Sequence, residues 1–562
     1  MQLTGSQLLL NTLIEQGVEL IFGYPGGAIM PTYDALFDKQ SQLHHVLMRH
    51  EQGAVHAAVG YARASGNVGV CLATSGPGAT NLITGIADAM MDSVPLVCIT
   101  GQVAQQFLGT DAFQESDIVS MTIPVTKWNY QVTCAEEIPY IMAKAFSVAT
   151  QGRPGPVLVD ITKDVQLALT NATTLSSPQK CSVSNKNITL SNHALKQAAE
   201  LLNHAKRPIL LVGQGVTLAR AEEELLHLAE KADLPVAATL LGLSAFPTGH
   251  RLFKGMLGMH GNYAANLLCN EADVVLAVGM RFDDRVTGDL TRYLTNAKVI
   301  HIDIDVAELN KNVPATVGLH SDAKQALTAL LPLIKTTQHQ AWHQQFAQLH
   351  AQELNTVIEP STNPRQGQIT MAEFIHQLSA QTHGQALLVT DVGQHQMIAA
   401  RYYQFTCTRS HITSGGLGTM GFALPAALGA QLAQPDRLVI TIAGDGGFQM
   451  NIQELMVVVQ EKLPLKMVIL NNGYLGMVRQ WQELFFEKRY AFTEMLNPDF
   501  VTVAQGYGIA GLKVTTREQL TPAIDTLLTT PSAYLLEVCV AKEDNVFPMV
   551  PSGASISETR LK

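Results

Sequence analysis

Two short motifs in the C-terminal third of the chain could together hold a divalent cation and a diphosphate. A β-branched run, Leu438–Ala443, leads into Gly444-Asp-Gly-Gly447, and the next such run ends just before Asn472. A helix over about 451–462 should join the two strands in parallel, so that Asp445 and Asn472 lie at neighbouring strand ends. Mg2+ binds carboxylate and amide oxygens and keeps phosphate and water ligands. We therefore predict a metal site made of Asp445, Asn472 and the main-chain carbonyl of Tyr474.

The spacing between the two motifs favours a metal site over an unrelated turn and helix cap. Taken alone, Gly-Asp-Gly is more often a turn and Asn-Asn a helix cap. Asn472 follows Asp445 by 27 residues, the length of one helix and one strand, and it supplies a second oxygen donor. The glycines allow close approach of the backbone to phosphates, and a helix N-terminus favours negative charge. The pair therefore favours a diphosphate and metal loop.

Glu51 is a candidate for a functional carboxylate. It lies in Arg49-His-Glu-Gln-Gly53, directly after the expected strand His45–Met48, and opens a helix rich in Ala and Gly. An unpaired carboxylate buried there would be costly, which favours a functional role. The alternative is a first-turn glutamate that complements the helix dipole.

Glycine-rich loops mark where ligands should bind. In parallel sheets ligands lie at the carboxyl ends of strands, where the chain turns into a helix. Besides the Gly444 loop, the loops that qualify are 22–27, 74–78, 213–215 and 415–418.

The elements that position these loops predict an α/β protein of three doubly wound parallel-sheet domains. Short β-branched runs alternate with helix-length segments, which is typical of sheets covered on both faces. Polar stretches divide the chain: 170–189 should be a linker, and 336–368 a helix followed by a linker. We predict domains over 1–169, 190–335 and 369–545, with a C-terminal tail over 546–562. The first and third domains could be distant copies of one architecture.

Composition excludes several classes of protein. Hydrophobic residues make up 47% of the 562 residues and charged residues 15%, which favours an oligomer with large buried surfaces. The net charge of -10 is spread without a basic block, which argues against nucleic acid and anionic membranes as partners. Seven scattered cysteines without a CxxC pair favour a reduced compartment and no structural zinc. Residues 1–17 resemble a helix starting near Thr4, not a signal peptide, and no apolar run approaches the ~18 residues of a membrane span. We expect a cytoplasmic protein.

The ordered motifs resemble one enzyme family over nearly the whole chain. This is the catalytic large subunit of acetohydroxyacid synthase, or acetolactate synthase, of the biosynthetic bacterial type, which depends on thiamine diphosphate (ThDP). The matching motifs are FGYPGGAIMPTYDAL from Phe22, RHEQGA from Arg49, TSGPGATN from Thr74, GTDAFQE from Gly109, GRPGPVLVD from Gly152, GMLGMHG from Gly255, RFDDRVTG from Arg281, TDVGQHQM from Thr390, TSGGLGTMGFALPAA from Thr413, the GDG/NN pair, LGMVRQWQELFF from Leu475, and VPSGA near the C-terminus.

The resemblance implies a carboligase. Such an enzyme decarboxylates pyruvate and joins the remaining two-carbon unit to pyruvate or 2-ketobutyrate, the first common step of branched-chain amino acid synthesis. It implies three cofactors: ThDP, Mg2+ and a structural FAD. It also implies a homodimer or a dimer of dimers, in which Glu51 and Asp445 meet from different subunits. A separate small regulatory subunit is the further partner expected.

The resemblance also assigns residues around the coenzyme. Glu51 would activate ThDP through its aminopyrimidine ring, Gly27 and Gln114 would lie near the reacting carbonyl, and Met420 would hold the coenzyme bent. The remaining ThDP contacts would be Gly393, Gln394, His395, Gly418, Gly444, Gly446, Gly447, Leu475, Gly476, Met477 and Val478.

A third set would select the acceptor. Arg285 would bind the carboxylate of the second keto acid, because a guanidinium can hold it bidentately. Trp481, Met477 and Phe113 would form the apolar wall around its alkyl group, and Lys163 would lie at the channel mouth. Taken alone, Arg285 is more often a surface partner of Asp283 or Asp284, and Trp481 more often core. Thr162 stands where the family usually has proline, which leaves the loop geometry open.

The middle domain would hold FAD. The Gly213–Gly215 run departs from GxGxxG and would alone be more often a strand–helix turn, so the inference rests on RFDDR and GMLGMHG. The implied contacts are Arg153, Gly213, Gln214, Gly215, Thr239, Leu240, Leu257, Met259, His260, Gly279, Arg281, Asp283, Arg285, Val286, Asp303, Ile304 and Asp322.

Two alternatives remain at this stage. One is a pyruvate oxidase that uses ThDP and FAD, against which the acceptor-site tryptophan and arginine argue. The other is a noncatalytic flavin-binding regulatory protein on the same fold, which retention of Glu51, Asp445 and Asn472 disfavours.

Overall fold

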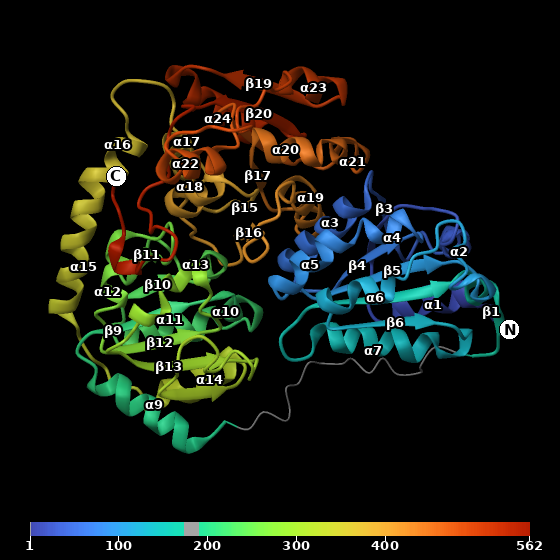
Figure 1. Cartoon of the computed structure of the whole chain (residues 1–562), viewed down its shortest axis with the longest axis horizontal. Helices are drawn as coiled ribbons and strands as arrows, with labels where there is room; N and C mark the ends of the chain where they lie inside the picture. Colours follow the sequence, from blue (N-terminus) through green and yellow to red (C-terminus); the bar gives the residue numbers. More distant parts are fainter. Residues whose placement is uncertain (1, 173–189) are drawn as a thin grey trace.

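Three six-stranded parallel sheets, each covered by helices on both faces, make up the computed structural model (Figure 1), which describes residues 2–172 and 190–562. The predicted fold class is therefore confirmed. The linker predicted over 170–189 lies, beyond residue 172, outside the described residues, as does Cys181. At the N-terminus, helix α1 (Gly5–Glu15) begins after Thr4, whose side chain and that of Gln7 form a capping box, as the sequence predicts.

The N-terminal sheet has the strand order β3-β2-β4-β5-β7-β6. Alternate strand residues point to two separate cores: Val70 and Leu72 face α1, α2 and α7, whereas Cys71 and Ala73 face α3 and α5. The bounds are β2 (Leu20–Gly23), β3 (His44–Leu47), β4 (Gly69–Ala73), β5 (Leu96–Gln102), β6 (Trp128–Val132), β7 (Pro156–Thr162), α2 (Met30–Phe37), α3 (Glu51–Ser65), α5 (Ile83–Met91) and α7 (Ile138–Thr150).

The C-terminal sheet repeats this topology. Its order, β16-β15-β17-β18-β20-β19, is the N-terminal order when the strands of each sheet are numbered along the chain. The similarity suspected between the first and third domains is thus present in their strand order. The bounds are β15 (Leu387–Thr390), β16 (His411–Thr413), β17 (Val439–Gly444), β18 (Lys466–Asn471), β19 (Ala510–Val514), β20 (Tyr534–Cys539), α17 (Met371–Gln381), α18 (Gln394–Tyr402), α19 (Ala423–Ala433), α22 (Gly476–Phe485), α23 (Phe500–Gly506) and α24 (Leu520–Thr529).

The central sheet differs, with the order β11-β10-β9-β12-β13-β14. Counted along the chain this is 3-2-1-4-5-6, the order of dinucleotide-binding Rossmann folds. The bounds are β9 (Pro208–Val212), β10 (Val236–Ala238), β11 (Phe253–Met256), β12 (Val274–Val278), β13 (Lys298–Asp303), β14 (Val317–His320), α9 (Asn192–His204), α11 (Glu222–Lys231), α12 (Tyr263–Cys269) and α14 (Ala323–Leu330). A long helix, α15 (Gln340–Glu353), then leads to the C-terminal sheet, as predicted for this stretch (Figure 1).

The N-terminal and C-terminal domains share a core through α3 and α19. The two helices cross with their backbones in contact: a Cβ at Gly60 would lie 1.9 Å from the carbonyl oxygen of Ala426, and one at Gly429 would lie 1.8 Å from that of Ala57. Only glycine allows such an approach. The crossing fixes the position of α3, and therefore of Glu51 at its N-terminus, relative to the C-terminal sheet.

The single helix predicted over 451–462 is wrong in its bounds. Helix α20 (Asp445–Met450) starts directly at the Gly444 loop, and after a short 3-10 turn the chain resumes as α21 (Leu455–Gln460). The break lies at Asn451, whose backbone leaves the helical region and whose side chain donates a 2.6 Å hydrogen bond to the carbonyl of Gly421. A long-range side-chain contact thus replaces continuous helix geometry.

Candidate functional site

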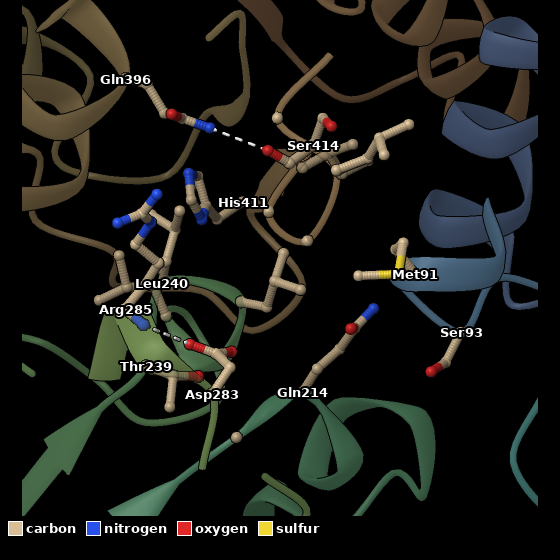
Figure 2. Close-up of a pocket in the computed structure, with 18 of the residues that line it drawn as sticks. Met91, Ser93, Gln214, Thr239, Leu240, Asp283, Arg285, Gln396, His411 and Ser414 are labelled. Atoms are coloured by element: carbon tan, nitrogen blue, oxygen red, sulfur yellow. Dashed lines mark hydrogen bonds between the residues drawn. The ribbon is translucent and has the colours of Figure 1, made fainter. Parts of the chain in front are cut away.

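A cavity of about 1060 Å³ lies between the three domains (Figure 2). Ligands in such sheets bind where the strand order reverses. In the central sheet this point lies between β9 and β12, which end just before Gly213 and Gly279. In the C-terminal sheet it lies between β15 and β17, which end just before Asp391 and Asp445. Loops from both points line the cavity. The N-terminal domain closes it with Met91 and Ser93, which lie across from Gln214 in Figure 2.

Every predicted site residue of the central and C-terminal domains lines this cavity. The predicted FAD set does so in full, as do all the ThDP contacts predicted in the C-terminal domain, the metal ligands Asp445, Asn472 and Tyr474, and the acceptor residues Arg285, Met477 and Trp481. One continuous cavity therefore borders the predicted FAD residues as well as the predicted ThDP and metal residues.

The metal loop lies in the predicted βαβ unit. Strands β17 and β18 are parallel, with Gly444 opposite Leu470, so Asp445 and Asn472 follow neighbouring strand ends. The Asn472 amide donates a 3.2 Å hydrogen bond to Gln394, while its oxygen accepts from the N–H of Tyr474 at 3.1 Å. Gln394 thus fixes which way the amide points. The Asp445 carboxylate is buried, and burial raises its pKa. A cation bound there would favour the charged form.

The residues around this loop fit a diphosphate. The ring of His395 covers Gly444, where a Cβ would lie 2.8 Å from the ring, so glycine is required. Burial lowers the pKa of His395 to about 3, which keeps the ring neutral. Its buried Nε2 has no protein partner, and His395 lines the cavity. An unpartnered buried nitrogen beside a glycine loop and a helix N-terminus suits a phosphate oxygen.

Sequence reasoning missed two residues that shape this loop. Asn497 donates to the Asp445 carboxylate at 2.6 Å and to the Asn471 side chain at 3.1 Å. Asp391, within the TDVGQ motif, accepts from the backbone N–H groups of Gly421 and Ala423 at 3.0 and 2.9 Å. The TDVGQHQM motif contains Asp391 and is the signal that could have identified it, whereas nothing in the local sequence around Asn497 signals its contact.

The predicted residues of the N-terminal domain form a separate group. Gly27, Glu51, Phe113, Gln114 and Lys163 do not line the cavity of the single chain. They follow strand ends of the N-terminal sheet, whose order reverses between β2 and β4. We call these five the N-terminal group.

Contacts within the N-terminal group centre on the 74–78 loop. Glu51 is only 9% exposed, and its carboxylate accepts a 3.0 Å hydrogen bond from Asn81. A Cβ at Gly78 would lie 3.2 Å from Glu51, and one at Gly76 would lie 3.0 Å from Gln114. Gly27 faces open space, and Phe113 is 88% exposed. This edge of the sheet therefore has an uncovered apolar surface beside a buried carboxylate.

Arg285 forms the surface ion pair that was one of its alternatives, whereas Trp481 is not the core residue that its type alone would suggest. Arg285 is exposed and lies 3.6 Å from the Asp284 carboxylate, the surface ion pair that its type alone suggests, yet it also lines the cavity. An exposed pair of this kind holds little energy, so the guanidinium is free to exchange partners. Trp481 is partly exposed and packs on Phe485 with ring centroids 5.1 Å apart, so it is not plain core.

The central part of the cavity has Rossmann-like geometry. A Cβ at Gly215 would lie 2.6 Å from the Cα of Gly279, so the loops after β9 and β12 touch through their backbones. Asp303, at the end of β13, faces the cavity, and burial raises its pKa to about 6. Arg153 enters from the N-terminal domain, held by Glu308 at 2.9 Å. Glycine loops whose backbones touch, and an acid at the end of β13, are features that suit a dinucleotide.

A further buried acid, Glu454, contacts the start of α3. Its two carboxylate oxygens accept from the backbone N–H of Arg49 at 3.3 and 3.2 Å, two residues before Glu51. A Cβ at Gly53 would lie 2.5 Å from the carboxylate. Burial raises the pKa of Glu454 from 4.5 to about 7.

This pKa predicts a pH-dependent stability. Between pH 4.5 and about 7 the folded protein holds a proton that unfolded Glu454 has lost, so stability falls as pH rises through this window. Glu454→Gln should remove that loss, about 3 kcal/mol at most. At pH 8 the Tm of Glu454→Gln should exceed that of wild type by more than it does at pH 5. Exposed Glu359→Gln is the control. Equal pH dependence in wild type and Glu454→Gln would contradict the expectation.

Among the described residues, no helix has the length and apolar character to cross a membrane. The same part of the chain has no cluster of three His, Cys, Asp or Glu side chains placed for a metal. The predicted metal site is of another kind, with one carboxylate, one amide and one main-chain oxygen.

Comparison with known proteins identifies all three domains. Residues 3–121, 195–330 and 391–538 match the N-terminal TPP binding, central and C-terminal TPP binding domains of thiamine pyrophosphate enzymes, TPP being another name for ThDP. The chain is 49% identical to the acetolactate synthase isozyme 2 large subunit of Escherichia coli K12, over 99% of both chains. It is 44% identical to the acetolactate synthase large subunit of Lactococcus lactis, over 99% and 96% of the two chains. Chloroplastic acetolactate synthase 2 of Nicotiana tabacum is also 44% identical, over 99% of this chain and 84% of the tobacco chain.

Proposed function

The chain belongs to the ThDP-dependent family of acetolactate synthase large subunits, and from this premise we propose how its residues carry out the reaction. The reaction decarboxylates pyruvate and joins the two-carbon unit to a second pyruvate or to 2-ketobutyrate. It forms acetolactate or acetohydroxybutyrate, the first common step of branched-chain amino acid biosynthesis. The observation that carries our assignment of the site is that one cavity is lined by the predicted metal and FAD residues and by the ThDP residues predicted in the C-terminal domain.

ThDP and Mg2+ would bind at the Gly444 loop. Asp445, Asn472 and the carbonyl of Tyr474 would hold the cation, and the His395 Nε2 would donate to a diphosphate oxygen once the phosphate charge favours the protonated ring. When bound, ThDP would supply a nucleophilic carbon for the keto group and an electron sink for the decarboxylation. Met420 would hold the coenzyme in the shape that its chemistry requires, and Leu475, which lies with it beside Gly446, would contact the coenzyme.

Glu51 would act on the coenzyme of a partner subunit. Its distance from the cavity in the single chain supports this proposal, because a buried carboxylate beside an uncovered apolar edge suits a face that a second copy covers. Glu51 would exchange a proton with the aminopyrimidine ring. Gly27 and Gln114 would lie over the reacting carbonyl, and Gln114 could donate a hydrogen bond to the developing oxyanion. The active unit is thus a homodimer, or a dimer of dimers.

FAD would occupy the central part of the cavity in a structural role. The Rossmann strand order, the touching glycine loops after β9 and β12, and Asp303 at the end of β13 support it. The paired Arg153 and Glu308 would hold the N-terminal domain against this end of the cavity.

Acceptor selection would fall to Arg285, Trp481 and Met477, which line the same cavity. Arg285, released from its weak pair with Asp284, would bind the carboxylate of the second keto acid. Trp481 and Met477 would surround its alkyl group, while Phe113 and Lys163 would come from the partner subunit. An apolar pocket discriminates one methylene by only about 1–3 kcal/mol.

Trp481→Leu should therefore weaken the preference for 2-ketobutyrate over pyruvate by about threefold to tenfold, because the pocket loses its flat apolar wall. The measurement is the ratio of acetohydroxybutyrate to acetolactate formed from mixed keto acids. Trp128→Leu is the matched control, since Trp128 stacks on Tyr130 in the N-terminal domain and does not line the cavity. An unchanged product ratio in Trp481→Leu would rule out the proposed wall.

Product analysis also separates the alternatives. Anaerobic formation of acetolactate from pyruvate, with ThDP and Mg2+ and no electron acceptor, is the result expected of this protein. A pyruvate oxidase would need an acceptor under these conditions, and a noncatalytic regulatory protein would form no product. We further propose a cytoplasmic location and a small regulatory subunit, since several relatives are named as large subunits.

A further inference from the structure

The loop over residues 413–421, which we call the coenzyme loop, forms one wall of the cavity. Ser414, Leu417 and Met420 are among its cavity-lining residues, and Figure 2 shows Ser414 on this wall. Four of its nine residues are glycine, and Gly418 and Gly421 have φ of +72° and +84°. A chain so rich in glycine has little conformational preference of its own. Its shape must therefore be set by contacts behind it.

Two aspartates of the N-terminal domain provide those contacts. Asp92, at the end of α5, accepts from two consecutive backbone N–H groups, that of Gly415 at 2.9 Å and that of Gly416 at 2.7 Å. Asp88, one turn earlier, accepts from the hydroxyl of Ser414 and from that of Thr419 at 3.1 Å. Four donors of the coenzyme loop thus end on two carboxylates that lie behind it and do not line the cavity.

The loop lies directly on the end of α5. A Cβ at Gly416 would be 2.8 Å from the Asp92 carboxylate and 2.9 Å from the Cβ of Met91. A side chain at position 416 would collide with both residues, so glycine permits this approach, and the hydrogen bonds from Gly415 and Gly416 to Asp92 hold the loop there, next to Met91, which itself lines the cavity.

The electrostatics indicate that this arrangement is costly. Asp88 and Asp92 are 0% and 1% exposed, and the nearest cation is Arg63, 3.6 Å from Asp92. Burial, and then the charge of Asp88, raise the pKa of Asp92 to about 6. Arg63 also donates to the carbonyl of Thr413 at 2.5 Å, at the start of the loop. Buried ion clusters rarely add net stability compared with apolar packing, but they can specify one geometry.

We propose that Asp88 and Asp92 are positioning residues, which hold the coenzyme loop, and Met420 within it, in the shape that ThDP binding requires. This proposal rests on the coenzyme site proposed above. The aspartates do not touch coenzyme or substrate and act through the loop alone.

The test is the affinity for ThDP, titrated calorimetrically in the presence of Mg2+ and FAD. Asp92→Asn keeps the size of the side chain but replaces one acceptor oxygen with an NH2 group that faces a backbone N–H. Its Kd for ThDP should rise at least tenfold. Ser414→Ala should give a smaller rise, and its effect should be smaller in an Asp88→Asn background than in wild type, because part of that effect is the lost hydrogen bond to Asp88.

Asp233→Asn is the matched control. Asp233 is a buried carboxylate that also accepts from an arginine, Arg251 at 2.7 Å, and from a backbone N–H, that of His339 at 2.8 Å, but it does not line the cavity. Its replacement should lower Tm and leave the Kd for ThDP unchanged. A wild-type Kd in Asp92→Asn, with a loss of Tm like that of Asp233→Asn, would overturn the proposal.

Two further variants keep the test decisive. If Asp92→Asn does not fold, unchanged affinity in both Ser414→Ala and Thr419→Val would equally overturn it. Asp445→Asn, titrated alongside, tests the coenzyme site itself. If that variant binds ThDP normally, the proposed site is wrong. If it binds weakly while Asp92→Asn binds normally, the positioning role alone fails.

Discussion

Glu51→Gln should lower acetolactate formation by about 10²- to 10⁴-fold while ThDP and Mg2+ still bind with nearly wild-type affinity. Glutamine keeps the shape of the side chain and can still accept the 3.0 Å hydrogen bond from Asn81, but it cannot exchange a proton with the coenzyme. The loss should therefore fall on kcat. Steady-state assays with pyruvate, together with calorimetric titration of ThDP, separate the two effects.

The neighbouring Gln52→Glu is a useful control, because it changes charge at the next position of α3 without altering Glu51. It should retain most of its activity. Near-normal turnover in Glu51→Gln would refute the activating role, and a loss confined to ThDP affinity would point to a binding role instead.

Asp445→Asn should raise the Kd for ThDP about 100-fold, roughly 2.7 kcal/mol, and abolish its dependence on Mg2+. The variant keeps the hydrogen-bonding size of the residue but removes the only carboxylate among the proposed metal ligands. Chelation of the cation from wild type should have the same effect on ThDP binding. Exposed Asp436→Asn, nine residues earlier, is the control and should bind ThDP normally. Retained Mg2+ dependence in Asp445→Asn would place the cation elsewhere.

The two variants together test the shared site. If Glu51 and Asp445 act on one coenzyme from different subunits, each inactive variant can complement the other. Mixed dimers then hold one site in which both residues are native. Co-expression should restore a measurable part of wild-type activity. Activity no greater than that of either variant alone would indicate that each site draws on a single chain.

The sequence by itself determined the class of fold and most of the residues at the cavity. Predicted strands such as Leu438–Ala443 appear within a residue of their observed ends, because a fully buried parallel strand is an apolar run that local chemistry marks at both ends. The loops that follow these strands were visible as glycine runs, so Gly213, Gly444 and their neighbours could be found without coordinates. The resemblance to a family then supplied roles that spacing alone could not.

Only the tertiary structure decided which strand ends meet. Strand order differs between the central sheet and the other two, and it sets where each crevice lies. The tertiary structure also shows that Glu51 lies outside the cavity of the single chain. It further shows the contacts of Asp88, Asp92, Glu454 and Asn497, whose partners lie far away in the chain. A side chain's own sequence neighbourhood carries its burial pattern and its propensities, but not the identity of a distant backbone N–H. Those long-range hydrogen bonds exist only once the domains have packed.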